Sequence, residues 1–394
     1  MNRRQFVSGL GAAGVALIQP AGMRAAAPTA PVAIAKCKSY GDEYLAATAK
    51  MFDQLGGLGR IVKGKTVTIK INLTGVESAR QDYLPQGRTI WTHPRTVGTV
   101  IHLLDKAGAR RIRVVEGAWM WPASLEEFMW KAGWDPELLL GAAPRVELVN
   151  TNLPYKGKQP YTRFPVPQGG LLFPAYDLSS VYAESDVLVS MNKIKEHGTA
   201  GVTLSIKNLF GITPTTIYGN KVPKDQPAPR PYAGRTDIGH MGNRQPPSSS
   251  LPEKDPGSPR QAGYRIPRIV ADLAAAAPVS LALLDGIDTV AGAELPRPGT
   301  TVAISPGVLV AGLNAVNTDA VAMAVMGLDP MADRGKVPFE TCDNTLRLAE
   351  ELGVGTRDLG RIEVVGASIK DVVFRFRDYG GPRQRRLPGN RPAA

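Results

Sequence analysis

Apolar runs of strand length alternate with an amphipathic stretch in the first third of the chain. Thr66–Ile71 alternates apolar and polar positions with the period of a strand, and Arg111–Val115 is a second run of this kind. Between them, Pro94–Lys106 has helical spacing, with a proline in its first turn and Gly108 after its end. This order of strand, helix and strand predicts a βαβ unit with two parallel strands.

Similar runs continue through the rest of the chain. Strands are predicted at Val32–Ala35, Val146–Val149, Val187–Met191, Ser280–Leu284, Gly307–Gly312 and Ile362–Val365, and helices at Glu43–Leu55, Ile266–Ala275, Asn317–Met326 and Cys342–Leu352. We therefore predict an α/β fold with a mostly parallel or mixed central sheet flanked by helices. Ile212–Arg265 holds ten prolines and six glycines without any periodic pattern, which predicts a long, irregular Pro/Gly-rich loop insertion.

The stretch Asp186–Gly211 joins a strand, a basic loop and a helix. Thr199–Phe210 has helical spacing, and Gly211 is placed as a C-cap glycine. The polar residues between the strand and this helix are Asn192, Lys193, Lys195, Glu196 and His197. Ligands of open α/β sheets bind outside the carboxyl ends of the strands, where helix N-termini also point. The cations at this position predict an anion-binding loop.

Several predicted strands end on a polar side chain. These residues are Asn72, Glu116, Asn192, Lys193 and Asp285. If the strands are parallel neighbours, these side chains gather along one edge of the sheet. A structural interpretation stays open for each residue taken singly, because turns favour Asn and Asp and because Asp319 can complement a helix dipole.

The first 30 residues have the features of a targeting segment. Arg3-Arg4-Gln5-Phe6 is a twin-arginine pattern, and Val7–Ile18 is an apolar run too short to span a membrane as a mature helix. We predict a twin-arginine (Tat) signal peptide at residues 1–30, recognition by the Tat translocon, and a periplasmic or otherwise exported protein. An α/β domain at 31–379 and a basic disordered tail at 380–394 complete the predicted organisation.

Charge, cysteine content and missing motifs limit the functions that this chain can have. The net charge is +12 over 394 residues, yet basic blocks interleaved with aromatic residues are absent, so we expect no nucleic-acid partner. The only cysteines are Cys37 and Cys342, and in an oxidising compartment they are able to pair. Neither a Walker A loop nor a G-x-S-x-G motif is present, which argues against P-loop and α/β-hydrolase chemistry.

A set of motifs carries a resemblance to a known family. K-x-K-x-H at 193–197 and T-L-S-I-K-N-L-F-G at 203–211 form its centre, flanked by Ile69–Asn72, Thr92–Pro94, Val115–Gly117, Leu284–Ile287 and Asn317–Ala320. Over roughly residues 65–366 the chain resembles the family described as domain of unknown function 362 (DUF362). The resemblance implies an α/β fold but no particular reaction, and His240 resembles a histidine that the family places after the central motif. Many relatives carry ferredoxin-like cysteine runs; with two cysteines, this chain is expected to hold no iron–sulfur cluster.

The candidate site is assembled from these observations. His197 and Glu116 are the candidate catalytic groups, because nearby cations tune the pKa of groups that move protons. The candidate ligand-binding residues are Asn72, His93, Asn192, Lys193, Lys195, Lys207, Asn208, His240, Asp285 and Asp319. Two hypotheses stay open: an enzyme acting on a small anionic metabolite, and a non-catalytic ligand-binding or cofactor-carrying protein with a redox-associated role.

A metal site is a further hypothesis. His93, His197 and His240, with Glu116 or Asp285, would supply nitrogen and oxygen ligands suited to zinc or iron, although no tight metal-site spacing supports this set. The sequence does not determine the cofactor, the substrate or the oligomeric state.

Overall fold

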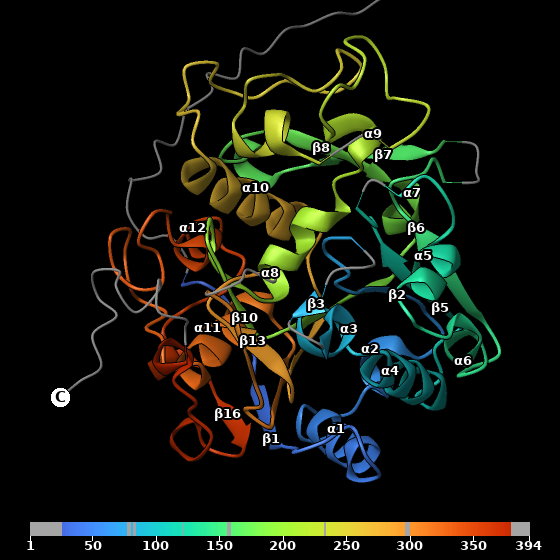
Figure 1. Cartoon of the computed structure of the whole chain (residues 1–394), viewed down its shortest axis with the longest axis vertical. Helices are drawn as coiled ribbons and strands as arrows, with labels where there is room; N and C mark the ends of the chain where they lie inside the picture. Colours follow the sequence, from blue (N-terminus) through green and yellow to red (C-terminus); the bar gives the residue numbers. More distant parts are fainter. Residues whose placement is uncertain are drawn as a thin grey trace, which may run out of the picture.

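An eight-stranded sheet forms the centre of the molecule, in the order β16-β1-β15-β12-β9-β2-β5-β6 (Figure 1). The computed structural model describes residues 26–379 apart from 77–79, 82–83, 120, 156–158, 232–233 and 296–299. The strands, in sheet order, are Val364–Gly366, Val32–Lys36, Val308–Gly312, Leu281–Gly286, Val187–Lys193, Thr66–Lys70, Arg111–Glu116 and Val146–Asn150. The predicted α/β fold is confirmed, whereas the predicted leader up to residue 25 and the tail from residue 380 lie outside the described residues.

Most strands of this sheet run in the same direction. β12, β9, β2, β5 and β6 are successive parallel neighbours. β15 is antiparallel to both β12 and β1, and β16 is parallel to β1, so β15 alone is reversed among these eight strands. The register places Asp285 opposite Lys193. The polar ends of β2, β5, β9 and β12 therefore meet at one edge of the sheet, as the strand pattern predicted.

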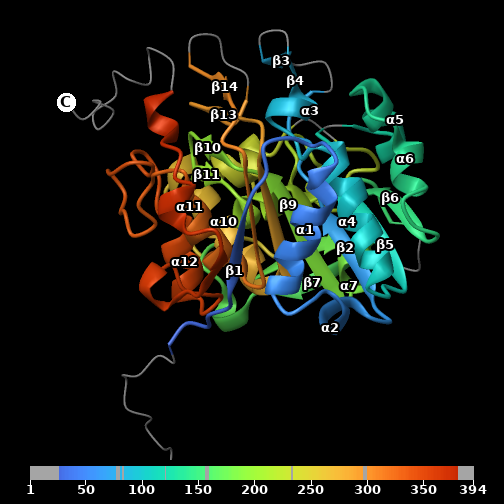
Figure 2. The ribbon, with the colours of Figure 1, turned by 90° about the horizontal axis from the view of Figure 1, so that it is seen from below.

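Helices cover both faces of the sheet (Figure 2). One face packs against α1 (Glu43–Gln54), α4 (Pro94–Lys106), α5 (Leu125–Lys131) and α6 (Pro136–Leu140), and the other against α8 (Ser205–Asn208), α10 (Ala262–Ala276), α11 (Ala315–Val325) and α12 (Thr345–Glu351). Each face of the sheet has its own hydrophobic core, the first beneath α1, α4, α5 and α6 and the second beneath α8, α10, α11 and α12. Side chains of β9 alternate between them: Val187 and Val189 belong to the first core, and Leu188 belongs to the second. This period of two is the geometry of a pleated strand buried on both sides.

The central stretch differs from its prediction. β9 extends to Lys193, and a hairpin of β10 (Lys195–His197) and β11 (Gly201–Thr203) replaces most of the expected helix at 199–210. Gly201 has φ +74°, and a Cβ there would lie 2.6 Å from the ring of Phe339, so the chain turns where a helix would have to continue. Helical structure begins only with α8 and the following 3₁₀ turn η2 (Leu209–Ile212).

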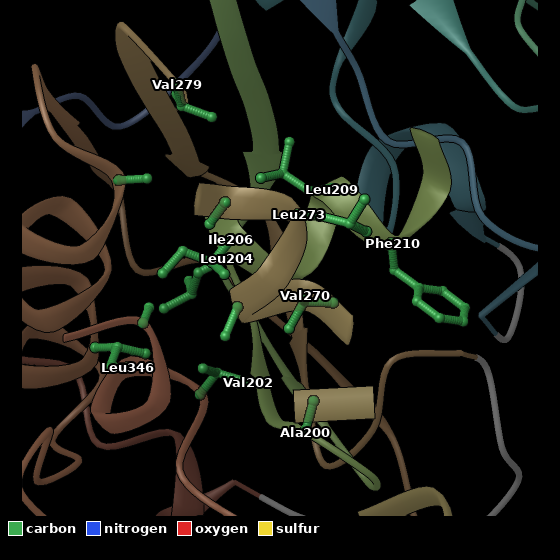
Figure 3. Packing of buried hydrophobic residues seen from close by; sticks show 14 of the residues in the cluster. Ala200, Val202, Leu204, Ile206, Leu209, Phe210, Val270, Leu273, Val279 and Leu346 are labelled. Carbon is green, nitrogen blue, oxygen red and sulfur yellow. The ribbon is translucent and has the colours of Figure 1, made fainter. Parts of the chain in front are cut away.

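The helical spacing of this stretch still reports which side chains are buried. Val202 and Ile206 pack in the core beneath α10, together with Leu204 and Leu209 (Figure 3). Phe210 belongs to the same core and also lines a cavity at the sheet edge; in Figure 3 its ring points away from the other labelled side chains.

The Pro/Gly-rich insertion is more ordered than its composition suggests. It contains α9 (Thr215–Tyr218), a π-helical turn η3 (Thr236–His240) and the start of α10 at Ala262. Buried apolar side chains, among them Ile217 and Ile238, pin it to the second core. Arg265 and Glu253 form a fully buried ion pair of 2.6 Å near its end. These anchors hold the insertion against the edge of the sheet where the polar strand ends meet.

Smaller elements complete the fold. They are the strand pairs β3 (Arg80–Gln81) with β4 (Leu84–Pro85), β7 (Tyr161–Pro165) with β8 (Ala175–Ser179) and β13 (Thr289–Ala291) with β14 (Val302–Ile304), the helices α2 (Gly59–Val62), α3 (Gln86–Thr89) and α7 (Ser180–Ala183), and the 3₁₀ turns η1 (Pro167–Gly169), η4 (Leu359–Arg361), η5 (Ile369–Asp371) and η6 (Phe376–Asp378). α11 and α12 begin at Ala315 and Thr345 because Asn314 and Asn344 cap them. In the part of the chain that the structure describes, no helix has the length and apolarity that a membrane span needs.

Candidate functional site

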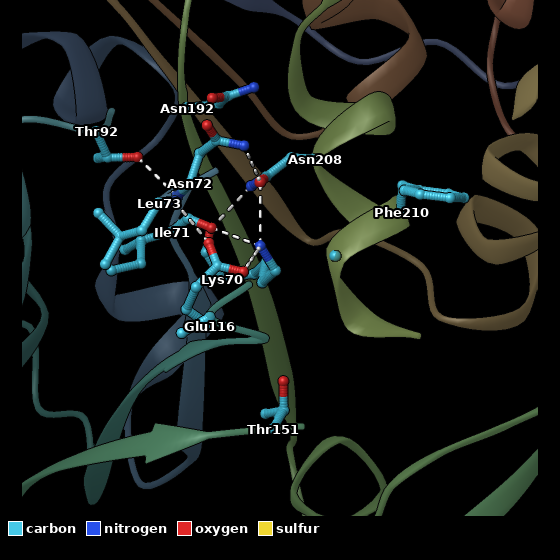
Figure 4. Close-up of polar contacts among 12 residues, drawn as sticks. Lys70, Ile71, Asn72, Leu73, Thr92, Glu116, Thr151, Asn192, Asn208 and Phe210 are labelled. Carbon is cyan, nitrogen blue, oxygen red and sulfur yellow. Dashed lines mark hydrogen bonds and ion pairs between the residues drawn. The ribbon is translucent and has the colours of Figure 1, made fainter. Parts of the chain in front are cut away.

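A buried polar network ties the ends of β2 and β5 to α8 (Figure 4). Lys70 Nζ lies 2.8 Å from Glu116 Oε1 and donates to Asn208 Oδ1 at 3.2 Å. Glu116 Oε2 accepts a hydrogen bond of 2.7 Å from the backbone N–H of Leu73. Asn72 Nδ2 also donates to Asn208 Oδ1, at 3.2 Å. Lys70 was not among the predicted site residues, although a lysine within the apolar β2 run was a visible signal.

A cavity of about 380 Å³ opens above this network. Six of the twelve predicted site residues line it: Asn72, Glu116, His197, Lys207, Asn208 and His240. Its volume lies in the range of small-molecule sites. The insertion supplies a further wall through Gly234, Arg235 and His240, so this segment helps to form the site.

Two cations of the cavity are held against one aromatic ring. Lys207 Nζ lies 4.8 Å, and Arg235 Cζ 5.7 Å, from the centre of the Phe210 ring, distances typical of cation–π contacts. The Arg235 guanidinium donates to the carbonyl oxygen of Thr213 at 2.7 Å and to Asn152 Oδ1 at 3.3 Å, both of them neutral acceptors. Sequence reasoning missed both Arg235 and Phe210.

Burial lowers the pKa of both cations, and repulsion by other cations adds to the shift of Lys207 alone. Desolvation lowers the pKa of Lys207 to about 8, with Glu294 opposing the shift and Arg235 and Lys70 adding to it. Desolvation also lowers the pKa of Arg235, to about 10. The cavity therefore holds two buried cations, whose charge is partly offset by Glu294, which raises the pKa of Lys207, and by Glu116, which raises the pKa of Arg235.

Two histidines line the same cavity from different elements. His197 ends β10, and His240 ends the turn η3. Desolvation is the main cause that lowers the pKa of both rings, well below the usual value for His197, and the positive charge of Lys207 lowers both further. Both rings are therefore neutral near pH 7.

Four residues of the same sheet edge form a separate cluster that does not line the cavity. Lys193 Nζ lies 2.9 Å from Asp285 Oδ2 and also donates to the hydroxyl of Tyr40. The Tyr40 hydroxyl lies 2.8 Å and 2.9 Å from the two Asp285 oxygens. The His93 ring stacks on Tyr40 with 3.6 Å between ring centres, and its Nδ1 caps α4. Desolvation, then the charge of Lys193, lowers the pKa of His93 to about 4.

Ligand binding by Lys193, Asp285 and His93 therefore stays a prediction, and the structure shows all three engaged in contacts within the protein. The charges of Lys193 and Asp285 compensate each other in the interior, with side chains that are 0% and 1% exposed. His93 is occupied by its stacking on Tyr40 and by the N–H of Arg95, which donates to its Nδ1 at 3.1 Å. These contacts fasten the chain around Tyr40 and the start of α4 to the sheet.

Three further predicted residues also lie outside the cavity lining. Lys195 Nζ donates to Asn72 Oδ1 at 3.1 Å and to the carbonyl oxygen of Ile90 at 2.8 Å, and desolvation lowers its pKa to about 7. Asn192 donates to the carbonyl oxygen of Leu204 at 3.1 Å. Lys195 thus reaches the cavity only through Asn72, which it positions, and Asn192 holds the backbone between β11 and α8.

Asp319 is the third of these residues, and it caps α8 from a distant part of the chain. It accepts hydrogen bonds of 2.9 Å from the backbone N–H groups of Ser205 and Ile206 and a further one from the Ser205 hydroxyl. Desolvation raises its pKa to about 7. Asp319 lies beyond the first turn of α11, which corrects the interpretation that it complements the dipole of its own helix, whereas ligand binding by Asp319 stays a prediction.

The described residues do not bring together the side chains that the metal hypothesis requires. Among the described residues, no group of three or more His, Cys, Asp or Glu side chains is placed to hold a metal ion. His93 and Asp285 belong to the Tyr40 cluster, whereas His197, His240 and Glu116 line the cavity. Cys37 and Cys342 are both buried and free, so the disulfide considered from the sequence is absent.

Comparisons with known proteins place these features in context. The family model described as "Domain of unknown function (DUF362)" matches residues 67–324. The thylakoid-associated protein sll1697 of Synechocystis sp. is 28% identical over 186 residues, which make up 46% of this chain and 50% of that protein. The chain thus spans about half the length of the curated relative that it matches.

Solved structures show weaker likeness. The lactate racemase apoprotein from Thermoanaerobacterium thermosaccharolyticum has 14% identity and a TM-score of 0.36, over 70% of this chain and 54% of that one. A protein from Thermotoga maritima has 13% identity and a TM-score of 0.32, over 64% and 54%. Likeness at this level carries no argument about the function of this chain.

Proposed function

The chain belongs to the family described as domain of unknown function 362 (DUF362), and we propose that its cavity at the carboxyl edge of the sheet binds a small anionic ligand. The pairing of Lys207 with Arg235 on the Phe210 ring carries this proposal. Neither cation forms an ion pair with a carboxylate among the described residues, and both have lowered pKa values. An anion between them relieves their repulsion and forms charge-assisted hydrogen bonds.

The volume of the cavity and the residues that line it also suit a small anionic ligand. Its volume of about 380 Å³ suits a molecule of modest size, and Trp119 and Phe210 supply apolar walls. Lys70 contributes little net charge to the floor because Glu116 lies 2.8 Å from its Nζ. The anion is therefore held by Lys207 and Arg235.

Replacing Lys207 with methionine should weaken anion binding by about 10–100-fold, the loss of one charge-assisted hydrogen bond. We would titrate phenylacetate, sulfate and phosphate into the purified protein by calorimetry. Because Lys207 loses its proton as the pH rises through about 8, wild-type affinity should fall over that range, whereas the variant should lack this step.

The matched control for this experiment is Lys106→Met, an exposed lysine on α4. It should bind each anion as the wild type does. Equal affinities for wild type and Lys207→Met would contradict the proposal, and so would a lack of binding by wild type to these three anions and to mandelate, the hydroxylated form of phenylacetate. A melt without ligand should show that Lys207→Met is as stable as wild type, since a repelled cation has been removed.

A proton-transfer enzyme is the second candidate function, and the two neutral histidines of the cavity favour it. Glu116 is the weaker candidate for this role, because its two oxygens already accept from Lys70 and from the backbone of Leu73. In the alternative, a non-catalytic binding or cofactor-carrying protein, the same cations hold the ligand without any reaction.

We further propose that the protein is exported through the Tat pathway to the periplasm, on the basis of Arg3-Arg4 and the apolar run Val7–Ile18. Replacing both Arg3 and Arg4 with lysine should leave the precursor in the cytoplasm, as measured by fractionation and immunoblotting. Arg24→Lys, outside the pair, is the control and should be exported normally. Accumulation of the double variant in the periplasm at the wild-type level would refute the proposal.

A further inference from the structure

The hydrogen bond made by His197 determines where its proton lies. The backbone N–H of Thr199 donates to His197 Nδ1 at 3.1 Å. A backbone N–H can only donate, so Nδ1 acts as an acceptor and carries no proton. The proton of the neutral ring is therefore on Nε2, which makes this nitrogen a hydrogen-bond donor.

The hydrogen bond made by His240 determines the opposite arrangement. Its Nδ1 lies 3.1 Å from the carbonyl oxygen of Arg235. A carbonyl oxygen can only accept, so the proton of His240 is on Nδ1. The Nε2 of this neutral ring is left as a bare acceptor. The Phe210 ring, 5.3 Å away and nearly perpendicular, packs against the His240 ring and restricts its rotation.

The rings of His197 and His240 line the same cavity, and each carries one ring proton because its pKa is lowered. Desolvation lowers the pKa of each ring. The charges of Lys207 and Lys195 lower the pKa of His197 further, and those of Lys207 and Arg235 lower the pKa of His240. Glu294 opposes both shifts, and the hydrogen bond to the Arg235 backbone opposes that of His240. Besides the carboxylates of Glu116 and Glu294, the cavity lining therefore offers cationic donors, the neutral donor of His197 and the neutral acceptor of His240.

We propose that His197 and His240 select an anion that also carries a hydroxyl group: His197 Nε2–H donates to the ligand, and His240 Nε2 accepts from its hydroxyl. This inference rests on the proposed anion-binding function and names the chemical class of the ligand. An anion without a hydroxyl would leave the His240 acceptor unpaired or facing an oxygen lone pair, which costs binding free energy. A site that hydrogen-bonds a hydroxyl rejects the analogue that lacks it.

Two pairs of probes differ in whether the anion carries a hydroxyl group; in the second pair the average charge differs as well. Mandelate is phenylacetate with a hydroxyl next to the carboxylate, and its ring suits the Trp119 and Phe210 walls. Phosphate near pH 7 carries a hydroxyl, whereas sulfate carries none. The first pair represents organic hydroxy acids, and the second represents inorganic or esterified phosphate. Comparing the two pairs therefore shows which of these two kinds of hydroxyl-bearing anion the cavity prefers.

Calorimetric titration should show wild-type protein binding the hydroxyl-bearing member of at least one pair about tenfold or more tightly than its partner. His240→Leu should bring this ratio close to one, and His240→Gln should restore part of it, because the amide oxygen can accept. His102→Leu, on α4 and outside the cavity lining, is the matched control and should keep the wild-type ratio.

Nitrogen NMR of ¹⁵N-histidine-labelled protein tests the proton positions without any ligand. The chain has four histidines, so the signals are few. His197 should show a protonated Nε2 and His240 a protonated Nδ1 near pH 7. The reverse tautomer at either ring would overturn the proposal even if His240→Leu failed to fold.

The same titrations distinguish a failure of the hydroxyl selection from a failure of anion binding. Equal affinity for both members of each pair would overturn the hydroxyl selection while leaving anion binding intact. A lack of binding to all four anions would remove the anion site itself, and the hydroxyl selection with it.

Discussion

Replacing Lys193 with methionine is expected to lower the free energy of unfolding by about 3–5 kcal/mol, because the Asp285 carboxylate is then left buried without its cation. The two side chains are 0% and 1% exposed and 2.9 Å apart. Tyr40 would still donate to Asp285 but cannot neutralise it. Urea denaturation at pH 7, followed by circular dichroism, measures the loss.

Two comparisons make this result specific. Lys106→Met, an exposed change on α4, should alter stability by less than about 0.5 kcal/mol. Lys193→Met combined with Asp285→Asn should recover part of the loss, because the orphaned charge is removed. If Lys193→Met keeps wild-type stability but loses anion affinity, Lys193 belongs to the ligand site that the sequence predicted.

Replacing Asp319 with alanine should lower the free energy of unfolding by about 2–5 kcal/mol. The change leaves the backbone N–H groups of Ser205 and Ile206 buried without an acceptor and opens space in the core. The loss should be visible in the same denaturation experiment. α8 carries Lys207, so anion binding should weaken as a secondary effect.

Asp53→Ala, an exposed change on α1, is the control and should leave stability nearly unchanged. Asp319→Asn should also be less stable than wild type. Its amide oxygen can replace one carboxylate oxygen as an acceptor, but its NH₂ group would face a backbone N–H, and two donors cannot hydrogen-bond each other. A stable Asp319→Ala protein that no longer binds anions would show that Asp319 contacts the ligand and that the capping role is minor.

The fold was largely predictable because its signals are local. The period of two in β2 and β9 reports strands, and the helical spacing of Pro94–Lys106 reports α4. The expected helix at 199–210 was wrong because its pattern of buried positions is shared by a hairpin followed by a short helix. Gly201 at positive φ and the distant cap Asp319 decide between the two.

The candidate site was predictable only in part. The parallel order of strands brings the polar strand ends together, so their shared edge followed from the chain order. Arg235 was missed because it lies in the insertion, whose composition gives no periodic signal. Phe210 has the spacing of a core residue and does pack in the core, but the spacing gives no sign that its ring also lines the cavity and contacts Lys207 and Arg235.

The sequence by itself determined the order of most strands and helices, and with it the edge of the sheet where the polar strand ends gather. The tertiary structure decided which charged groups at that edge are available to a ligand. Lys193 is neutralised by Asp285, 92 residues away in the chain, and the Asp319 carboxylate is occupied by Ser205, 114 residues away. Hydrophobic periodicity reports the local backbone and the side that faces the core, whereas the charge that a ligand meets depends on distances between side chains that only folding brings together.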